Sequence, residues 1–410
     1  MAIRLMVWNI QFFSLKKIHD IHNKETCLQS VIRLGCILSN INQCKPDIFV
    51  LIEQLSSRGT VGTLIEGNGK IAALRLLFEL RGLQPQKNWY LVPPLKLAPQ
   101  TPVNELEDGH QDIAGENNYT EAISVFFSGN SLNFIGPYIW PNNNLSDQQK
   151  VAVPNNGFYQ PSPYPGYWYN WFPANNCYAG QWEFRNVNNQ LINFPNDANR
   201  RPFYTKFNDN QGRIINLFSI HTSPSSSREA VAKLCEVEEI KRGPQANEVI
   251  VVAGDFNLDP RGSVNIADSQ YFSQLNSDLK LQTNFPNQPT MLRQNGRSTT
   301  LIPKNRNPGS GYQTEGFYRK NEILDNILTK YGTNAGAPSN AQVIDQVYGV
   351  PFTTDMNADP LVFFNQYTES KNQSLTLTSK GAELFHDFLN YGHIGPRSGV
   401  SDHMALVIDI

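Results

Sequence analysis

Short apolar runs that suit β-strands alternate with segments of helical periodicity along most of this chain. The clearest run, at 249–253, is apolar at every position, as expected of a strand buried on both faces. Interleaving of this kind places helices against the faces of β-sheets, so the sequence predicts an α/β (α+β) layered fold. Strands are predicted at 3–13, 46–54, 121–127, 203–207, 213–220, 249–253, 323–329 and 403–410, and helices at 24–43, 69–81 and 227–242.

The first two predicted helices each carry an apolar face. Apolar residues three or four positions apart lie on one side of a helix, and we expect that side to pack against a sheet. The expected core residues are Leu28, Val31, Ile32, Leu38 and Ile41 in the first helix and Ile71, Leu74, Leu77 and Phe78 in the second.

Two interruptions separate the predicted strands. Residues 141–200 contain 14 Asn, 12 aromatic residues and 7 Pro, a composition that excludes a long helix or a central strand. Its aromatic side chains either form a small buried cluster of their own or offer a stacking surface for bases or sugars. The second interruption, 331–397, contains one predicted helix at 379–389. We therefore expect one domain, 1–410, enlarged by two insertions.

Charge and hydropathy limit the classes of function. Charged residues make up 17% of the chain and the net charge is −2, so binding of polyanions through net positive charge is excluded, although a local phosphate-binding groove is not. The N-terminal segment reads as a strand and not as a signal peptide, and no apolar run is long enough to cross a membrane. We expect a cytoplasmic protein without a membrane segment.

The strongest chemical signal is the segment Gly254-Asp255-Phe256-Asn257, which follows the most apolar predicted strand. In extended chain, residues two apart point to the same side, so Asp255 and Asn257 would face one site together. A carboxylate can activate water or hold a cation, and an amide can fix an oxygen, which suits metal-assisted attack at phosphorus. Because Gly, Asp and Asn also favour turns, the segment alone is equally compatible with an ordinary turn.

Polar residues at four further predicted strand ends favour the catalytic interpretation. In chain order they give Asn, Glu, His, Asp-x-Asn and Asp-His, and the residues are Asn9, Glu53, His221, Asp255 with Asn257, and Asp402 with His403. In this order and over residues 3–410 the sequence resembles the endonuclease/exonuclease/phosphatase superfamily. The resemblance implies a deoxyribonuclease I-like fold, a four-layer sandwich of two packed mixed β-sheets flanked by helices.

The resemblance also implies a role for each of these residues. Glu53 is similar to the metal-binding glutamate of the superfamily, with Asn9 and Asp402 on the metal side of the site. Such oxygen ligands suit Mg²⁺, with Mn²⁺ as a substitute. Asp255 corresponds to the residue that orients or deprotonates the attacking water, and Asn257 to one that holds a phosphate oxygen. The remaining pair, His221 and His403, is similar to the two catalytic histidines.

A cationic histidine needs a carboxylate to raise its pKa and fix its ring. Tyr119-Thr120-Glu121 resembles a Tyr-x-Glu segment of deoxyribonuclease I, so we predict that Glu121 supports His221, with Tyr119 beside it. By the same resemblance we predict that Asp325 supports His403. A solvated strand start is the alternative for Tyr119 and Glu121.

An arginine before the strand that leads to His221 resembles a phosphate-contacting residue of the deoxyribonuclease branch. Arg200 and Arg201 are both candidates, and a plain surface position is an equal alternative for each. We take Arg201, which directly precedes Pro202, as the predicted substrate-binding residue.

These features predict a divalent-metal-dependent phosphodiesterase, specifically an endonuclease that hydrolyses nucleic acid, DNA in preference to RNA, by in-line attack of water. Residue 55, two after Glu53, is leucine where deoxyribonuclease I has a minor-groove arginine, so a small-molecule or lipid phosphoester is the alternative substrate. A non-catalytic binding module with the same fold is a further alternative.

Overall fold

The computed structural model describes most of the chain, with gaps. The described residues are 2–19, 24–57, 59, 61–98, 119–139, 178–195, 200–261, 266–285, 323–345, 350–351, 400–401 and 403–410. Of the expected features, the helix at 379–389 and most of the aromatic segment 141–200 lie outside them.

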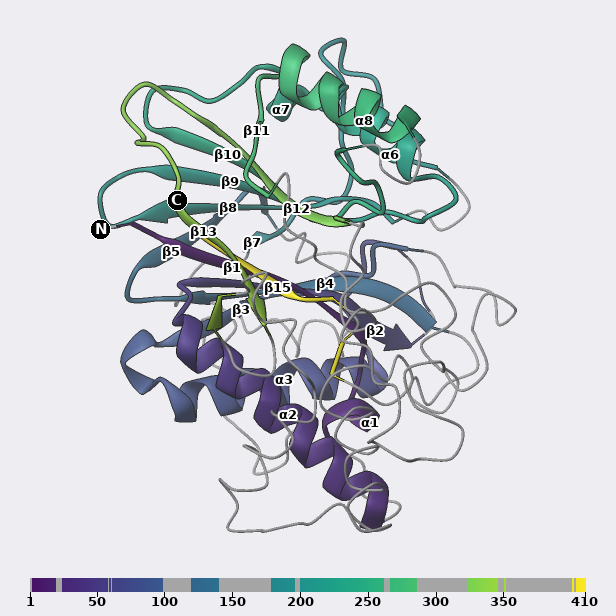
Figure 1. The fold of residues 1–410 in the computed structure, drawn as a ribbon, viewed down its shortest axis with the longest axis vertical. Helices are drawn as coiled ribbons and strands as arrows, with labels where there is room; N and C mark the ends of the chain where they lie inside the picture. Colours follow the sequence, from purple (N-terminus) through teal and green to yellow (C-terminus); the bar gives the residue numbers. More distant parts are fainter. Residues whose placement is uncertain are drawn as a thin grey trace, which may run out of the picture.

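Two mixed β-sheets form the centre of the molecule (Figure 1). The larger has seven strands in the order β14-β13-β15-β1-β2-β4-β3, and the smaller has six in the order β11-β12-β10-β9-β8-β5. Each contains one parallel pair, β1 with β2 and β9 with β10, among antiparallel neighbours. The strands of the larger sheet are β1 (Arg4–Phe13), β2 (Ile48–Ser57), β3 (Trp89–Val92), β4 (Tyr119–Ser128), β13 (Ser339–Asp345), β14 (Val350–Pro351) and β15 (Ala405–Asp409). Those of the smaller sheet are β5 (Leu132–Gly136), β8 (Phe203–Asp209), β9 (Ile214–His221), β10 (Glu248–Asp255), β11 (Gln282–Thr283) and β12 (Asp325–Tyr331).

Helices cover the outer face of each sheet (Figure 1). Beside the larger sheet lie α1 (Leu15–Ile18), α2 (Lys24–Cys44) and α3 (Gly67–Leu83). Beside the smaller sheet lie α6 (Ser227–Leu234), α7 (Glu238–Lys241) and α8 (Ile266–Ser273). Smaller elements are the 3₁₀ turn η1 (Pro85–Lys87), the π-turn η4 (Gln274–Asp278) and the two-stranded pair β6 (Tyr138–Ile139) and β7 (Tyr178–Ala179). The predicted four-layer sandwich is confirmed.

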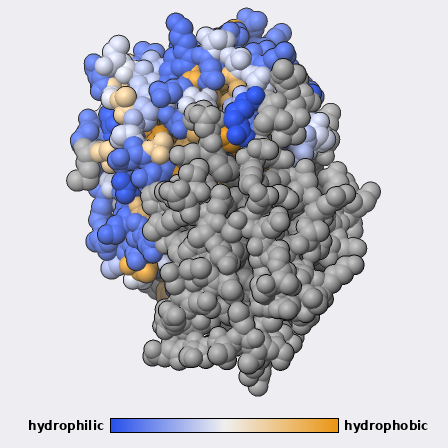
Figure 2. Space-filling view, viewed as in Figure 1, coloured by the Kyte–Doolittle hydropathy of each residue, from blue (hydrophilic) through white to orange (hydrophobic). Residues whose placement is uncertain are grey.

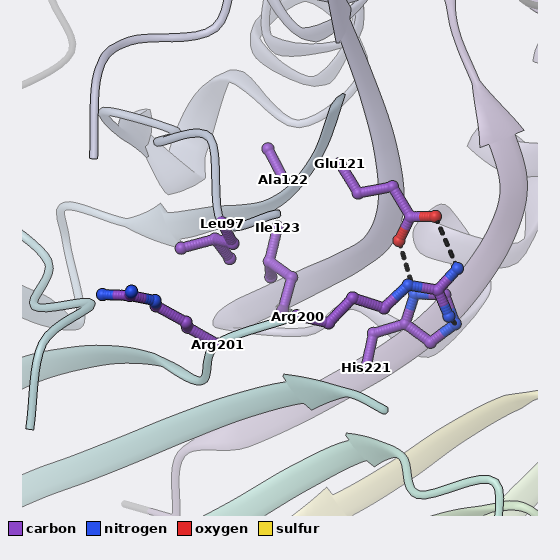
Figure 3. Close-up of a pocket in the computed structure, with 7 residues that line it drawn as sticks. All are labelled: Leu97, Glu121, Ala122, Ile123, Arg200, Arg201 and His221. Carbon is purple, nitrogen blue, oxygen red and sulfur yellow. Dashed lines mark hydrogen bonds and ion pairs between the residues drawn. The ribbon is translucent and has the colours of Figure 1, made fainter. Parts of the chain in front are cut away.

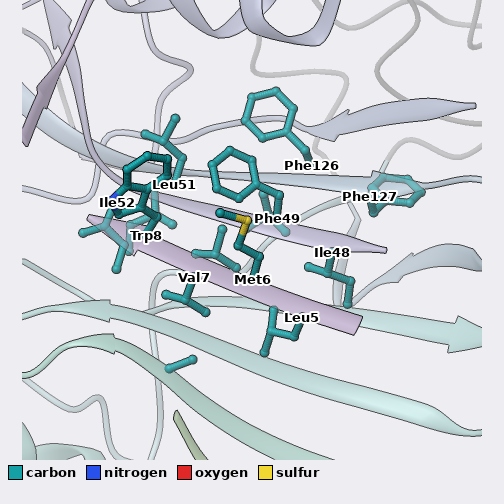
Figure 4. Packing of buried hydrophobic residues seen from close by; sticks show 14 of the residues in the cluster. Leu5, Met6, Val7, Trp8, Ile48, Phe49, Leu51, Ile52, Phe126 and Phe127 are labelled. Carbon is teal, nitrogen blue, oxygen red and sulfur yellow. The ribbon is translucent and has the colours of Figure 1, made fainter. Parts of the chain in front are cut away.

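Side-chain alternation along the central strands explains the two cores. In β10, Val249, Val251 and Ala253 join the main core between the sheets, whereas Ile250 and Val252 join a second core under the helices α6 and α8. A strand that serves two cores needs apolar residues at every position, as the sequence predicted. Figure 4 shows the same packing around β1, β2 and β4, where Trp8, Phe49 and Phe126 are fully buried.

The apolar stripe expected on α3 is wrong at Phe78, which is 55% exposed. The buried face runs instead through Ala72, Ala73, Leu76 and Leu80, together with the expected Leu74 and Leu77. Gly69 sets this rotation, because its Cα lies so close to the backbone oxygen of Leu55 in β2 that a Cβ would not fit.

The predicted helix at 227–242 is two helices, α6 and α7. The backbone of Val237 leaves the helical region, with φ −58° and ψ 123°, and its side chain is buried in the second core. Burial of this valine outweighs the local helical pattern.

The second interruption, 331–397, is not wholly an insertion. Tyr331 ends β12, and β13 pairs antiparallel with β15 as part of the larger sheet. The sequence of β13, Ser339–Asp345, lacks the alternation that would have predicted a strand.

The described end of the aromatic segment contributes to the second core. Phe184, Ile192 and Phe194 belong to the second core, and Phe184 lies 6.1 Å from Phe218 of β9, ring centre to ring centre. These aromatic residues therefore cover the smaller sheet and do not form a separate cluster.

Hydrophilic residues predominate on the described part of the face in Figure 2, in keeping with the use of apolar residues in the two cores. Among the described residues, none of the helices combines the length and the apolar character that a membrane span requires.

Candidate active site

Side chains from both sheets meet at one edge of the sandwich. The larger sheet supplies Asn9 from β1, Glu53 from β2, Glu121 from β4 and His403 just before β15. The smaller sheet supplies His221 and Asp255 at the ends of the parallel strands β9 and β10, and Asp325 at the start of β12. Because His221 and Asp255 are partners in the ladder, and Asp255 and Asp325 are too, the register alone brings these three together.

Asn9 and Glu53 lie within their strands and not at the strand ends as expected. The β1–β2 register shifts between Asn9 and Phe13, and the β2–β4 register shifts between Leu51 and Gln54. At these irregularities Phe12 and Glu53 have φ values of 52° and 60°, which are uncommon for side chains of this size. Bulges of this kind turn a side chain out of the regular alternation, and here they direct Glu53 to the site.

The backbone and Asn9 hold the Glu53 carboxylate. The amide N–H of Phe12 donates to Glu53 Oε2 at 3.1 Å, and Asn9 Nδ2 donates to Oε1 at 2.9 Å. Asn9 Nδ2 also donates to Asp255 Oδ2 at 3.1 Å and lies 3.5 Å from His403 Nε2. Within the described residues, Asn9 Oδ1 is buried and accepts no hydrogen bond. A buried acceptor without a partner calls for a cation or a donor.

Each histidine contacts the carboxylate predicted for it. His221 Nδ1 lies 2.8 Å from Glu121 Oε2, and His403 Nδ1 lies 2.7 Å from Asp325 Oδ2. The Nε2 atoms face Asp255 Oδ2 at 3.7 Å and 3.6 Å. His221 Nε2 also lies 3.5 Å from Glu53 Oε1. Hydrogen bonds at Nδ1 thus orient both rings, and the Nε2 atoms of both are directed to the carboxylate of Asp255.

Arg200, and not Arg201, belongs to this cluster (Figure 3). Arg200 Nη2 donates to Glu121 Oε1 at 2.8 Å, and its Nη1 lies 3.1 Å from His221 Nε2. In Figure 3 Arg201 points the other way, and its Nη1 lies 3.7 Å from Glu183 Oε1. The structure thus brings Arg200, and not the predicted Arg201, into contact with Glu121 and His221, and a role of either arginine in substrate binding stays a prediction.

Asn257 reaches the site through a turn and not through an extended strand. Its backbone φ is 47°, and its N–H donates to Asp255 Oδ1 at 2.8 Å. Its Nδ2 donates to the carbonyl oxygen of Thr222 at 2.7 Å. The expectation of simple alternation was wrong for this pair, since β10 ends at Asp255. The side chain of Tyr119 and all of Asp402 lie outside the described residues.

Burial and neighbouring charges shift the pKa values of Asp255 and Glu121 in opposite directions. Burial raises the pKa of Asp255 from 3.8 to about 6, and Asp325 adds to the rise while His403 and His221 oppose it. Burial also acts to raise the pKa of Glu121, but the Arg200 and His221 charges and hydrogen bonds outweigh it and lower that pKa to about 2. Glu121 is thus fixed as an anion, whereas Asp255 can exchange a proton near neutrality.

The donor set fits a divalent cation. Glu53, His221 and Asp255 each offer a ligand atom within 4.8 Å of the others, as do Asp255, Asp325 and His403. With the orphaned Asn9 Oδ1, the site is rich in oxygen donors, which Mg²⁺ and Mn²⁺ prefer. Carboxylates hold both histidine Nδ1 atoms, so Nε2 is the histidine atom that faces Asp255, and Glu53 and Asp255 are the carboxylates that could hold the ion.

Comparison with known proteins gives structures but no sequence match: no family model and no curated protein matches the chain. Similar solved structures include an endonuclease/exonuclease/phosphatase family protein from Leptotrichia buccalis (12% identity, 99% of this chain and 98% of that chain, TM-score 0.44). A second is D. rerio TDP2 complexed with single strand DNA product (9% identity, 100% of this chain and 98% of that chain, TM-score 0.44). A third is the human Nocturnin catalytic domain with bound sulfate anion (14% identity, 100% of this chain and 92% of that chain, TM-score 0.41). The first carries the name of the superfamily that the sequence motifs resemble. The activity of this chain is argued below from its own residues.

Proposed function

We propose that this protein is a divalent-metal-dependent phosphoester hydrolase of the endonuclease/exonuclease/phosphatase superfamily, and that it is an endonuclease acting on DNA in preference to RNA. One observation carries the proposal: two histidine–carboxylate pairs converge on Asp255, and Asn9 Nδ2 links Asp255 to Glu53. A cluster of this kind joins a base, proton donors and cation ligands at one point, as hydrolysis of a phosphoester requires.

Each side chain has a role in in-line attack by water. Asp255 orients the water and takes its proton, a task that suits a carboxyl whose pKa is raised to about 6. Glu121 and Asp325 hold the rings of His221 and His403 through Nδ1, and each Nε2, when protonated, donates to a phosphate oxygen. For His221 this requires that Arg200 Nη1, 3.1 Å from Nε2, direct its N–H to the Thr222 carbonyl and the phosphate instead. Asn257 and Arg200 donate to the phosphate from the side of the smaller sheet.

Glu53 and Asn9 would hold the cation, with Asp255 next to them and Asp402 as a further predicted ligand. When bound there, Mg²⁺ or Mn²⁺ supplies positive charge to the phosphate oxygens. Phe12 N–H and Asn9 Nδ2 orient the Glu53 carboxylate through hydrogen bonds that the protein itself supplies.

Nicking of supercoiled plasmid in Mg²⁺ tests the proposal. We expect activity that EDTA abolishes and that Asp255→Asn and His403→Ala each lower by at least ~10²-fold, the scale of a general base or an electrostatic donor. Asp278→Asn and His19→Ala are matched controls, because both residues are exposed and lie outside the site. If the wild type hydrolyses no phosphoester in Mg²⁺ or Mn²⁺, or if the two site variants cut as well as the controls, the proposed function is wrong.

A small-molecule or lipid phosphoester is a second candidate substrate. Leu55, two residues after Glu53, is 2% exposed in β2, where it pairs with Glu121. No side chain at that position can reach into a DNA groove, which removes one contact with duplex DNA. A panel of plasmid, single-stranded DNA, RNA, nucleotides and sphingomyelin vesicles distinguishes the two: faster turnover of the last two would replace the nuclease assignment. Binding of any of them without hydrolysis would indicate the non-catalytic module.

A further inference from the structure

Thr222 has every polar group bonded to a residue of the candidate site. It directly follows His221 and is 3% exposed. Its N–H donates to the carbonyl oxygen of Asp255 at 3.0 Å, and its hydroxyl donates to the carbonyl oxygen of Phe256. Its own carbonyl oxygen accepts from Asn257 Nδ2 at 2.7 Å and from Arg200 Nη1 at 3.2 Å. One residue therefore joins the ends of β9 and β10 to two of the proposed phosphate donors.

The bond from Asn257 sets the direction of its amide. The residue has a left-handed backbone, with φ 47°, so its conformation needs external support. An amide carries two N–H donors and one acceptor oxygen. With one N–H bonded to the Thr222 carbonyl oxygen, rotation of the amide is restricted and the second N–H stays available to a ligand.

Arg200 is oriented in the same way. Its Nη2 donates to Glu121 Oε1, and its Nη1 donates to the carbonyl oxygen of Thr222. A guanidinium held at two points keeps one plane, so donors that it presents to an anion have a defined direction. Both donors thus depend on where the carbonyl oxygen of Thr222 lies.

The hydroxyl of Thr222 holds that carbonyl in place together with the N–H bond to Asp255. It ties the turn after β9 to the backbone of Phe256, between Asp255 and Asn257. Valine has the same shape as threonine but cannot donate, so it would release the turn and leave the Phe256 carbonyl unpaired.

We propose that Thr222 is a positioning residue, which acts through Asn257 and Arg200 and sets their donors against a phosphate oxygen. That the ligand is a phosphate rests on the proposed function, whereas the contacts of Thr222 are those of the structure itself. It predicts that Thr222 affects the chemical step, since misplacing a donor by about 1 Å can cost ~10²-fold in rate.

Three variants of the full chain test it, with the phosphodiester that the wild type hydrolyses best in Mg²⁺. We expect Thr222→Val to lower kcat by at least ~10-fold with KM within ~2-fold, the pattern of an interaction realised in the transition state. Thr222→Ser should stay within ~2-fold of wild type, because it keeps the hydroxyl. Thr205→Val is the matched control: Thr205 is equally buried, and its hydroxyl donates to the backbone of Leu217 in mid-sheet.

Two further readouts separate positioning from a general loss of structure. In an Asn257→Ala background, Thr222→Val should lower kcat by much less than alone, because residues that act through one another are not additive. Hydrogen exchange of the 219–224 and 254–259 segments should rise at least ~10-fold in Thr222→Val and not in Thr222→Ser or Thr205→Val.

Each outcome decides one claim. A wild type without phosphoesterase activity overturns the proposed function, and the exchange measurement still decides the geometry of Thr222. If the wild type is active, equal kcat values in Thr222→Val and Thr205→Val overturn the positioning role. The role is also overturned if Thr222→Val lowers kcat as much in the Asn257→Ala background as it does alone. Unchanged exchange in Thr222→Val overturns it as well.

Discussion

Replacing Asp255 with asparagine should stabilise the metal-free protein at neutral pH while abolishing hydrolysis. The carboxyl is 2% exposed, and burial raises its pKa from 3.8 to about 6. A difference of about two units corresponds to about 3 kcal/mol, at 1.36 kcal/mol per unit, by which the ionised group destabilises the fold. Asparagine carries no charge and can still accept from the N–H of Asn257, but it places an N–H against Asn9 Nδ2, a loss of about 1 kcal/mol.

The sign of the pH dependence follows from proton linkage. Between about pH 4 and pH 6 the folded protein keeps the Asp255 proton and the unfolded chain has lost it, so unfolding releases a proton and is favoured by rising pH. The stabilising contribution of the protonated group is complete below pH 4 and is lost as the pH rises through 6. The variant does not share this loss, so it should be less stable than wild type by about 1 kcal/mol at pH 4 and more stable by about 2 kcal/mol at pH 7.

Thermal unfolding in EDTA measures the effect. A 410-residue chain loses about 0.9 kcal/mol of stability per degree near its midpoint, so the difference in Tm between variant and wild type should change by about 3 °C from pH 4 to pH 7. Added Mg²⁺ should raise the Tm of wild type more than that of the variant, because a ligand stabilises the state that binds it. A difference in Tm that is constant across this pH range would refute the reasoning about the buried carboxylate.

Three further predictions concern other parts of the structure. Arg200→Lys should lower kcat/KM by ~10-fold or more and Arg201→Lys by less than ~2-fold, because only the guanidinium of Arg200 donates to Glu121 and Thr222 at the same time. A larger loss in Arg201→Lys than in Arg200→Lys, measured on plasmid, would contradict the placement of Arg200 in the site. Leu77→Ala should cost about 2–5 kcal/mol in urea unfolding and Phe78→Ala less than about 0.5 kcal/mol, in line with their burial; equal losses would contradict the orientation of α3. The ionised form of Glu121 contributes stability that is present above pH 4.5 and lost as the pH falls toward 2, so the destabilisation by Glu121→Gln should shrink by about 3 kcal/mol over that range; a loss independent of pH would contradict the role of the charge.

Much of the candidate site could be predicted because its residues follow strong local signals. The apolar run of β10 predicts a buried strand, and the Gly-Asp-x-Asn segment predicts polar residues at its end, although Asn257 lies in a turn and not in the expected extended chain. The contacts of His221 with Glu121 and of His403 with Asp325 came from the resemblance, and the structure has both pairs in place. The catalytic roles of these residues stay predictions.

Other features depend on contacts between distant segments and left no local signal. Phe78 has the spacing of a core residue, but close packing of Gly69 on β2 turns it outward. Val237 breaks a helical pattern because the second core needs its side chain. Arg200 and Arg201 are alike in sequence, and only the backbone of the segment before β8 decides which of them contacts Glu121.

By itself the sequence determined most of the long buried strands, the layered fold class and the polar residues at the ends of several strands, because apolar periodicity and turn chemistry act between neighbours. Tertiary structure alone decided how Asn9 and Glu53 reach the site from within strands, through bulges in β1 and β2. It also decided that Thr222 joins the ends of β9 and β10. These outcomes depend on the register between strands far apart in sequence, which a local pattern does not specify.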